Sequence, residues 1–210
     1  MIKVLIVEDD PMARKLLEIY ITDSEKYSHE HSIESAAMAE LYCLKNPIDL
    51  ILMDVCTAMD ASGLDAAAKI KKSFPKIKII IVTSQPECTF IDRARAAGVE
   101  SFWYKSASAE EIIEVMDRTM AGESVYPDTT PSLRLGEALN VDFTEKELLV
   151  LREVVDGEAD ADIAEKLGMS LRTVKAHIQN MRDKTGFRNR TELAVRARES
   201  GLVINDHNTE

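Results

Sequence analysis

The sequence predicts two domains of different classes, an α/β domain with a parallel sheet followed by a small all-α domain. In residues 1–121, short apolar runs alternate with longer amphipathic stretches, a pattern typical of a doubly wound sheet covered by helices on both faces. Beyond residue 142 there is no strand pattern, only segments with helical periodicity. The length of 210 residues suits two small domains or one domain of moderate size.

Five strands and five helices are expected in residues 1–121. The strands are the apolar runs at 2–7, 50–53, 78–82 and 101–104 and a weaker segment at 27–32. The helices are the amphipathic stretches at 11–23, 34–45, 63–73, 86–97 and 108–121. The predicted fold class is therefore a five-stranded parallel α/β domain.

Residues 122–142 predict a linker, because they include two prolines, two glycines and several hydroxyl side chains. Four helices are expected in a second domain at 143–205. The first begins at a capping box formed by Thr144 and Glu147 and ends at Gly157. The others cover about 159–167, 171–184 after a cap at Ser170, and about 191 to Gly201.

Charge is distributed unevenly in the second domain. The whole chain carries a net charge of −11, which by itself argues against nucleic acid. From Asp142 to Glu165 there are nine acids and two bases, a net charge of −7. From Lys166 to Arg198 there are nine bases and two acids, a net charge of +7. A local basic patch of this kind is compatible with DNA binding.

Other global features point to a cytoplasmic protein with no membrane partner. No apolar run approaches the length of a membrane span, and the N-terminal segment is too short and too soon acidic for a secretory signal. The three cysteines, Cys43, Cys56 and Cys88, are widely spaced and form no CxxC pair. We therefore expect reduced thiols rather than disulfides or a zinc site.

Polar residues follow four of the predicted strands. Glu8 and Asp9 follow the first and Asp54 the third, whereas Thr83 follows the fourth and Lys105 the fifth. In open parallel sheets the carboxyl ends of the strands form the ligand-binding edge, so these groups should lie together. Asp10, just before Pro11, is more simply explained as a helix cap.

Three acids and a lysine at one edge predict a phosphoryl-transfer site. Clustered carboxylates repel one another, and Mg²⁺ with oxygen ligands would relieve that repulsion. Asp54 could then act as a nucleophile that accepts a phosphoryl group. Lys105 would bind one phosphoryl oxygen and Thr83 another.

These residues lie in segments that resemble the receiver domain of two-component response regulators. The matching segments are "VEDD", "LMD", "VTS" and "YK", at the ends of the four apolar strands. The resemblance implies a phosphoacceptor at Asp54, metal ligands at Glu8, Asp9, Asp54 and the Cys56 carbonyl, and a switch formed by Thr83 and Phe102. It also implies a histidine kinase as partner.

The loop after Asp54 departs from the receiver pattern. Ala58 stands where proline is usual and Gly63 comes one residue late, so we expect a longer and less rigid loop. A phosphatase of the haloacid dehalogenase type would also use a strand-end aspartate, but it needs a second aspartate two residues later, where this chain has Cys56. We therefore expect a regulator and not an enzyme.

The segment "SLRTVKAHIQNMRDK" predicts the DNA-reading helix. Leu171, Val174, Ile178, Met181 and Thr185 fall on one face of a helical wheel. The other side is basic, small or amide-bearing, as a major groove requires. We expect base contacts from Lys175 and Gln179 and backbone contacts from Arg182, Lys184 and Arg190. The rest of the predicted DNA-binding set is Arg172, Thr173, Ala176 and Asn180.

Residues 143–203 resemble the LuxR-type helix-turn-helix, through "FTEKELLVL", "IAEKLGMSLRTVKAHIQNMRDKTG" and "RTELAVRARESGLV". With the receiver, this resembles the NarL/FixJ class of response regulators. The resemblance implies a cytoplasmic regulator that binds double-stranded promoter DNA as a phosphorylation-dependent homodimer. Two alternatives remain: a phosphorylation-independent regulator with a degenerate receiver, and an adaptor whose basic helix binds protein. Asp160 and Asp162 lie in the stretch where the LuxR pattern usually has a basic residue near the DNA backbone. Their repulsion from phosphate predicts weak non-specific affinity for DNA.

Overall fold

A computed structural model describes residues 1–203 apart from 60, 88 and 106–108. Within it the chain forms two compact units. The first comprises Met1–Ser84 and Phe90–Asp128, and the second contains Thr129 and the residues after it together with Gln85–Thr89. Cys88, residue 108 of the predicted fifth helix and residues 204–205 of the predicted second domain lie outside the described residues.

The first unit is built on a five-stranded parallel sheet, which confirms the predicted fold class. The strand order is β2-β1-β3-β6-β7. The strands are β1 (Ile2–Val7), β2 (Tyr27–Ile33), β3 (Leu50–Met53), β6 (Lys78–Thr83) and β7 (Ser101–Tyr104). The strands are aligned near their carboxyl ends: Val7 pairs with Met53, Met53 with Ile81, and Thr83 with Tyr104. This alignment gives the sheet one common carboxyl edge.

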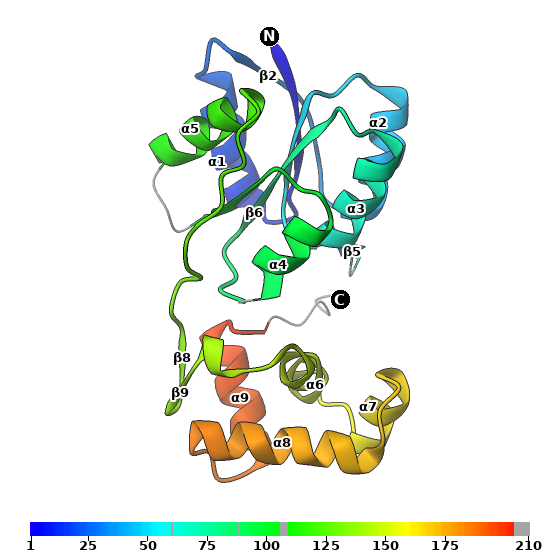
Figure 1. Ribbon diagram of the computed structural model, residues 1–210, viewed down its shortest axis with the longest axis vertical. Helices are drawn as coiled ribbons and strands as arrows, with labels where there is room; N and C mark the ends of the chain where they lie inside the picture. The colour runs from blue at the N-terminus through cyan, green and yellow to red at the C-terminus, as the bar shows by residue number, and fades with distance from the viewer. Residues whose placement is uncertain (60, 88, 106–108, 204–210) are drawn as a thin grey trace. The chain divides into compact units, whose positions relative to one another are not determined.

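Helices cover both faces of this sheet (Figure 1). On one face lie α1 (Pro11–Thr22) and α5 (Ala109–Met120), and on the other η1 (Ala36–Met38), α2 (Ala39–Lys45), α3 (Gly63–Ser73) and α4 (Thr89–Ala96). Trp103 belongs to the apolar core on the α1 and α5 face, whereas its neighbours Phe102 and Tyr104 belong to the other core. This alternation is the period of two that a strand imposes.

Local sequence explains where α1 begins. Asp10 is its N-cap, since the Asp10 carboxylate accepts a hydrogen bond from the Ala13 N–H at 2.7 Å, and Pro11 is the first helical residue. Proline is favoured there because it has no N–H to leave unpaired. The predicted role of Asp10 as a helix cap is thus confirmed.

The loop after Asp54 forms a short hairpin that the sequence did not predict. Its strands are β4 (Cys56–Thr57) and β5 (Ala61–Ser62). The Thr57 hydroxyl accepts a hydrogen bond from the Ala36 N–H at 2.8 Å and donates one to the Ala61 carbonyl at 2.7 Å. These bonds give the described part of the loop a defined conformation.

The chain beyond α5 stays attached to the first unit for several residues of the predicted linker. The Phe102 N–H donates to the Val125 carbonyl at 2.8 Å, and the Val125 N–H donates to the Ser101 hydroxyl at 3.1 Å. The Tyr126 hydroxyl donates to the Val99 carbonyl at 2.8 Å. These bonds place the segment alongside β7, which is the last strand of the sheet.

The described part of the second unit contains four α-helices, at nearly the predicted positions. They are α6 (Glu145–Val155), α7 (Asp160–Lys166), α8 (Leu171–Thr185) and α9 (Arg190–Ser200). Leu151, Ile163, Val174, Met181 and Leu193 are among the buried residues that join them. A hairpin of β8 (Arg134–Leu135) and β9 (Ala138–Leu139), then η2 (Asn140–Asp142), precede the helices.

The predicted caps of these helices are confirmed. Thr144 and Glu147 form a reciprocal capping box at α6, and the Ser170 hydroxyl accepts from the Thr173 N–H at the start of α8. Gly186 ends α8 with φ of 76°, a conformation that favours glycine. None of the helices in the described residues is both long enough and apolar enough to cross a membrane.

Candidate functional site

The carboxyl edge of the sheet brings together the predicted acids and the predicted lysine of the first unit. Backbone pairing continues one residue past the strands, since the Asp54 N–H donates to the Val7 carbonyl at 2.9 Å and the Lys105 N–H donates to the Thr83 carbonyl at 2.8 Å. Asp54 is therefore held beside the end of β1, and Lys105 beside the end of β6.

Lys105 joins two of the acids. Its Nζ atom lies 2.8 Å from Oδ2 of Asp54 and 2.6 Å from Oε2 of Glu8. The other Asp54 oxygen, Oδ1, accepts a hydrogen bond from the Val55 N–H at 2.7 Å. Asp54 is only 8% exposed and Glu8 only 1%, so this ion-paired group is largely removed from water.

Burial shifts the protonation equilibria of the group. Burial, followed by repulsion from Asp54, raises the pKa of Glu8 from 4.5 to about 7, although Lys105 opposes the shift. Burial also raises the pKa of Asp54 against the opposing effect of Lys105. Burial disfavours the Lys105 ammonium, but Asp54 and Glu8 outweigh it and raise the pKa of Lys105. Burial therefore outweighs the attraction of Lys105 at both acids.

The three acids offer a set of metal ligands. One carboxylate oxygen each from Glu8, Asp9 and Asp54 can be chosen so that all lie within 4.8 Å of one another. Asp9 is exposed, which leaves the set open on one side. Oxygen ligands with an open side suit a hard divalent cation that retains water. Cys56, whose carbonyl was a predicted ligand, begins β4 two residues after Asp54.

Thr83 and Phe102, the predicted switch pair, are both buried. Phe102 pairs with Ile81 across the β6 and β7 ladder, and Thr83 pairs with Tyr104. Because side chains alternate along a strand, Thr83 and Phe102 belong to the same face of the sheet.

Two contacts near the site were not foreseen from the sequence. The Arg14 guanidinium donates to the Glu8 carbonyl at 3.1 Å and pairs with Glu34 at 3.0 Å, so α1 holds the segment that carries the first acids. A Cβ atom on Gly63 would lie 1.8 Å from the Asp54 carbonyl oxygen. The signal for Gly63 was its place at the start of a helix, but the close approach depends on the path of the intervening hairpin.

In the second unit, α8 separates packed from exposed residues largely as predicted. Val174, Ile178, Met181 and Thr185 are buried. The exposed side contains Arg172, Thr173, Lys175, Ala176, Gln179 and Asn180. Leu171, expected on the apolar face, is 43% exposed. That prediction was wrong because Leu171 is the first helical residue, one turn before the packed segment begins.

The three predicted backbone-contacting bases all have partners within their own unit. Lys184 pairs with Glu147 at 2.7 Å and donates to the Asp142 carbonyl at 2.8 Å. Arg182 donates to the Arg188 carbonyl and Arg190 to the Glu158 carbonyl. Arg190 also pairs with Asp160 at 3.3 Å. Asp160, one of the two acids that depart from the LuxR pattern, thus offsets the positive charge of Arg190.

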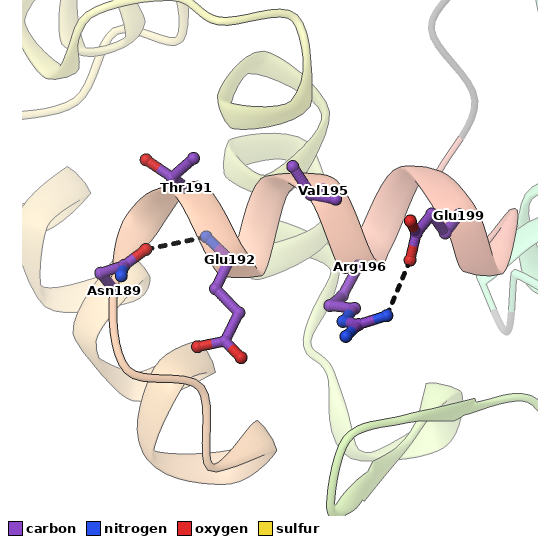
Figure 2. Close-up of a pocket in the computed structure, with 6 residues that line it drawn as sticks. All are labelled: Asn189, Thr191, Glu192, Val195, Arg196 and Glu199. Carbon is purple, nitrogen blue, oxygen red and sulfur yellow. Dashed lines mark hydrogen bonds and ion pairs between the residues drawn. The ribbon is translucent and has the colours of Figure 1, made fainter.

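Along α9 there is a shallow groove of about 430 Å³, lined by side chains of both charges (Figure 2). Asn189 caps the helix by accepting from the Glu192 N–H at 2.8 Å, and Arg196 pairs with Glu199 at 3.0 Å. Thr191 and Val195 complete the lining. None of the predicted DNA-binding residues lines this groove.

Comparison with known proteins gives the same two parts. Residues 4–117 match the response regulator receiver domain family, and residues 141–197 match the family of bacterial regulatory proteins of the luxR type. The response regulator protein VraR of Staphylococcus aureus strain Mu3 is 32% identical over 209 residues, which cover 96% of this chain and 99% of that protein.

Solved structures with the same fold include the RcsB response regulator of Salmonella typhimurium, at 19% identity and a TM-score of 0.58. That match covers 93% of this chain and 98% of RcsB. A structure of two RcsB dimers bound to two parallel DNAs matches at 18% identity and a TM-score of 0.58, covering 93% of this chain and 97% of that one. The chain belongs to the response regulators, with a receiver domain followed by a LuxR-type DNA-binding domain.

Proposed function

We propose that this protein is a transcription regulator of a two-component system whose DNA binding is controlled by phosphoryl transfer from a histidine kinase to Asp54. The observation that carries the proposal is the position of Asp54. Its carboxylate lies at the carboxyl edge of the sheet, next to Lys105 at 2.8 Å and within a cluster that includes Glu8 and Asp9. A buried acid with a cation and further acids around it suits a phosphoacceptor.

The proposed reaction needs no other nucleophile. A carboxylate oxygen of Asp54 attacks the phosphorus of a phosphohistidine, so a P–O bond forms as the P–N bond breaks. The imidazole nitrogen leaves with the bonding electrons and takes up a proton, and Asp54 becomes an acyl phosphate. Lys105 then pairs with a phosphoryl oxygen instead of the Asp54 carboxylate, and the Thr83 hydroxyl donates to another.

Glu8, Asp9, Asp54 and the Cys56 carbonyl are the proposed ligands of Mg²⁺. When bound, Mg²⁺ supplies positive charge that offsets the negative charge of the transferring group. Glu8 and Asp9 would hold the ion together with Asp54, because one carboxylate oxygen from each of the three residues lies within 4.8 Å of the others. Arg14 supports this arrangement because it fixes the Glu8 carbonyl.

The DNA-binding role rests on the exposed side of α8. Arg172 and Lys175 bring positive charge there, and Gln179 and Asn180 bring amides that can pair with adenine. RcsB, a structural relative, binds DNA as dimers, and we propose that this chain also forms a homodimer on double-stranded promoter DNA. A two-fold dimer would present two copies of α8 to two half-sites.

The phosphoacceptor is tested by intact mass. The full chain is incubated with Mg²⁺ and acetyl phosphate, and its mass should rise by one phosphoryl group. Asp54→Asn should abolish the increase, whereas Asp49→Asn, at the opposite end of β3, should retain it. Equal labelling of the Asp54→Asn variant would contradict the assignment. A native protein that does not label would instead favour a regulator that works without phosphorylation.

A further inference from the structure

A row of aromatic rings runs from the phosphoacceptor edge to the chain that leaves the first unit. The Tyr104 and Phe102 ring centroids are 5.0 Å apart and meet edge to face, with 61° between the ring planes. The Phe102 and Tyr126 centroids are 6.3 Å apart, with 29° between the planes. Arg95 of α4 covers the far ring, since its guanidinium carbon lies 4.1 Å from the Tyr126 centroid.

The first ring of the row adjoins the site directly. Tyr104 precedes Lys105 in the chain and pairs with Thr83 in the sheet. Lys105 and Thr83 are the groups that would move onto the oxygens of a phosphoryl group on Asp54. A shift of either residue therefore changes the backbone that positions Tyr104.

The last ring of the row belongs to the segment that continues toward the second unit. The Val125 carbonyl accepts from the Phe102 N–H, and the Val125 N–H donates to the Ser101 hydroxyl. The Ser101 hydroxyl also contacts the Thr119 hydroxyl of α5 at 2.6 Å. The segment is thus held by backbone bonds to β7 and by the Tyr126 ring.

We propose that Tyr126 is a positioning residue of the switch, through which a change at Asp54 reaches residues 123–128. The inference rests on the proposed phosphorylation of Asp54. Phe102 is 2% exposed and packed on both sides by rings, so it cannot move without displacing a neighbour. Repacking of Phe102 weakens its contact with Tyr126 and loosens the two hydrogen bonds that hold Val125.

The consequence for regulation is a change in the length of free chain. While Tyr126 is docked, the segment connecting the two units begins after residue 126. When the contact is lost, the segment gains the residues between α5 and Tyr126. A longer flexible connection increases the range of separations that the units can adopt, and this gives phosphorylation an effect on how two DNA-binding domains reach a pair of half-sites.

The test measures amide hydrogen exchange in the full chain by NMR. Exchange is compared with and without beryllofluoride, a mimic of the phosphoryl group, in the presence of Mg²⁺. In the native protein the Phe102 and Val125 amides should exchange about tenfold faster when the mimic is bound, because local opening becomes easier. In Tyr126→Ala both amides should exchange fast without the mimic and change no further with it. Tyr126→Phe keeps the ring and should respond as the native protein does.

Tyr20→Ala is the matched control, since it removes a half-buried ring from α1 on the opposite face of the sheet and should leave the response intact. If Tyr126→Ala does not fold, Tyr126→Leu provides the same comparison with more of the apolar volume retained. Binding of the mimic is followed independently by the fluorine signals of bound beryllofluoride.

Each outcome decides a different point. A native protein that binds the mimic without change at the Phe102 and Val125 amides would overturn the inference while leaving phosphorylation of Asp54 intact. A full response in Tyr126→Ala would show that the ring has no part in it. Failure of the native protein to bind the mimic or to label at Asp54 would overturn the proposed function, and this inference with it.

Discussion

The Nζ atom of Lys105 lies 2.8 Å from Oδ2 of Asp54, and this one ammonium also pairs with Glu8 at 2.6 Å. Lys105 is therefore the source of positive charge next to both buried acids. A cation that binds Glu8 and Asp54 would compete with Lys105 for their oxygens. A phosphoryl group on Asp54 would give Lys105 a new negatively charged partner.

Replacing Lys105 with methionine should destabilise the first unit. The change leaves Glu8 and Asp54 buried without a counter-charge, and breaking a buried pair by removing one partner typically costs about 3 kcal/mol or more. Adding Mg²⁺ should recover part of the loss because the metal restores positive charge. Urea unfolding with and without Mg²⁺ measures both effects.

Lys78→Met is the control for this variant. Lys78 pairs with Glu100 at 3.6 Å and is more exposed than Lys105, so its loss should cost less than about 1 kcal/mol and be insensitive to Mg²⁺. Equal unfolding free energies for the Lys105 and Lys78 variants would show that Lys105 does not compensate the buried acids.

The affinity for Mg²⁺ should increase with pH through neutrality. The pKa of Glu8 is raised to about 7, so below pH 7 most of this carboxyl is protonated and must release its proton before it can bind a cation. The expected change approaches tenfold per pH unit below the pKa. Calorimetric titrations at pH 6 and pH 8 measure it, and Glu8→Gln should remove most of the dependence.

The same shift has a consequence for folding without metal. The folded state binds the Glu8 proton more tightly than the unfolded state does, so the contribution of Glu8 to stability is complete below pH 4.5. It is lost as pH rises to about 7. The Glu8→Gln variant lacks this titrating group. We therefore expect its free energy of unfolding, relative to that of the native protein, to increase with pH across this range.

Gly63→Ala should distort the backbone at Asp54. The new Cβ would lie 1.8 Å from the Asp54 carbonyl oxygen, so backbone must move. Overpacking of this kind costs roughly 1–3 kcal/mol, and we expect slower labelling of Asp54 as well. Gly168→Ala is the control, because it has a φ of +64° but nothing within 4 Å of the added atom. It should add backbone strain and leave labelling unchanged.

Basic residues of α8 should divide into two groups when they are replaced. Arg172 is exposed, so Arg172→Ala should weaken binding to all DNA sequences and reduce the salt slope by about one unit. Lys184 is paired with Glu147 and donates to the Asp142 carbonyl, so Lys184→Met should lower the unfolding temperature and leave the salt slope unchanged. Salt-dependent binding and thermal unfolding of both variants separate the two cases.

The strands, the helices and the positions of the acids could be predicted because local sequence determines them. Apolar runs and caps such as Asp10 and Thr144 depend on residues within one or two turns, and the parallel sheet then brings its strand ends together. The hairpin after Asp54 could not be predicted in this way, since Thr57 is held by the Ala36 N–H, 21 residues away in the sequence.

The partners of charged residues could not be predicted from the sequence either. Lys184 is a basic residue of the kind that contacts DNA, but whether it faces DNA depends on how α6 packs against α8. That packing brings Glu147 within 2.7 Å of Lys184. Tyr126 lies in a segment whose prolines and glycines indicate a linker. Its contact with Phe102 depends on the edge of the sheet at β7, and the residues around Tyr126 in the sequence do not indicate that contact.

The place of β1 in the sheet has a consequence for synthesis of the protein on the ribosome. The apolar strand Ile2–Val7 precedes both of its neighbours in the chain, β2, which ends at Ile33, and β3, which ends at Met53. During synthesis, one hydrogen-bonding edge of β1 therefore has no partner until β2 has been made, and the other has none until β3 has been made. Because chains grow at roughly 5–20 residues per second, the nascent strand is exposed for seconds. This interval is the period in which a chaperone would be needed most.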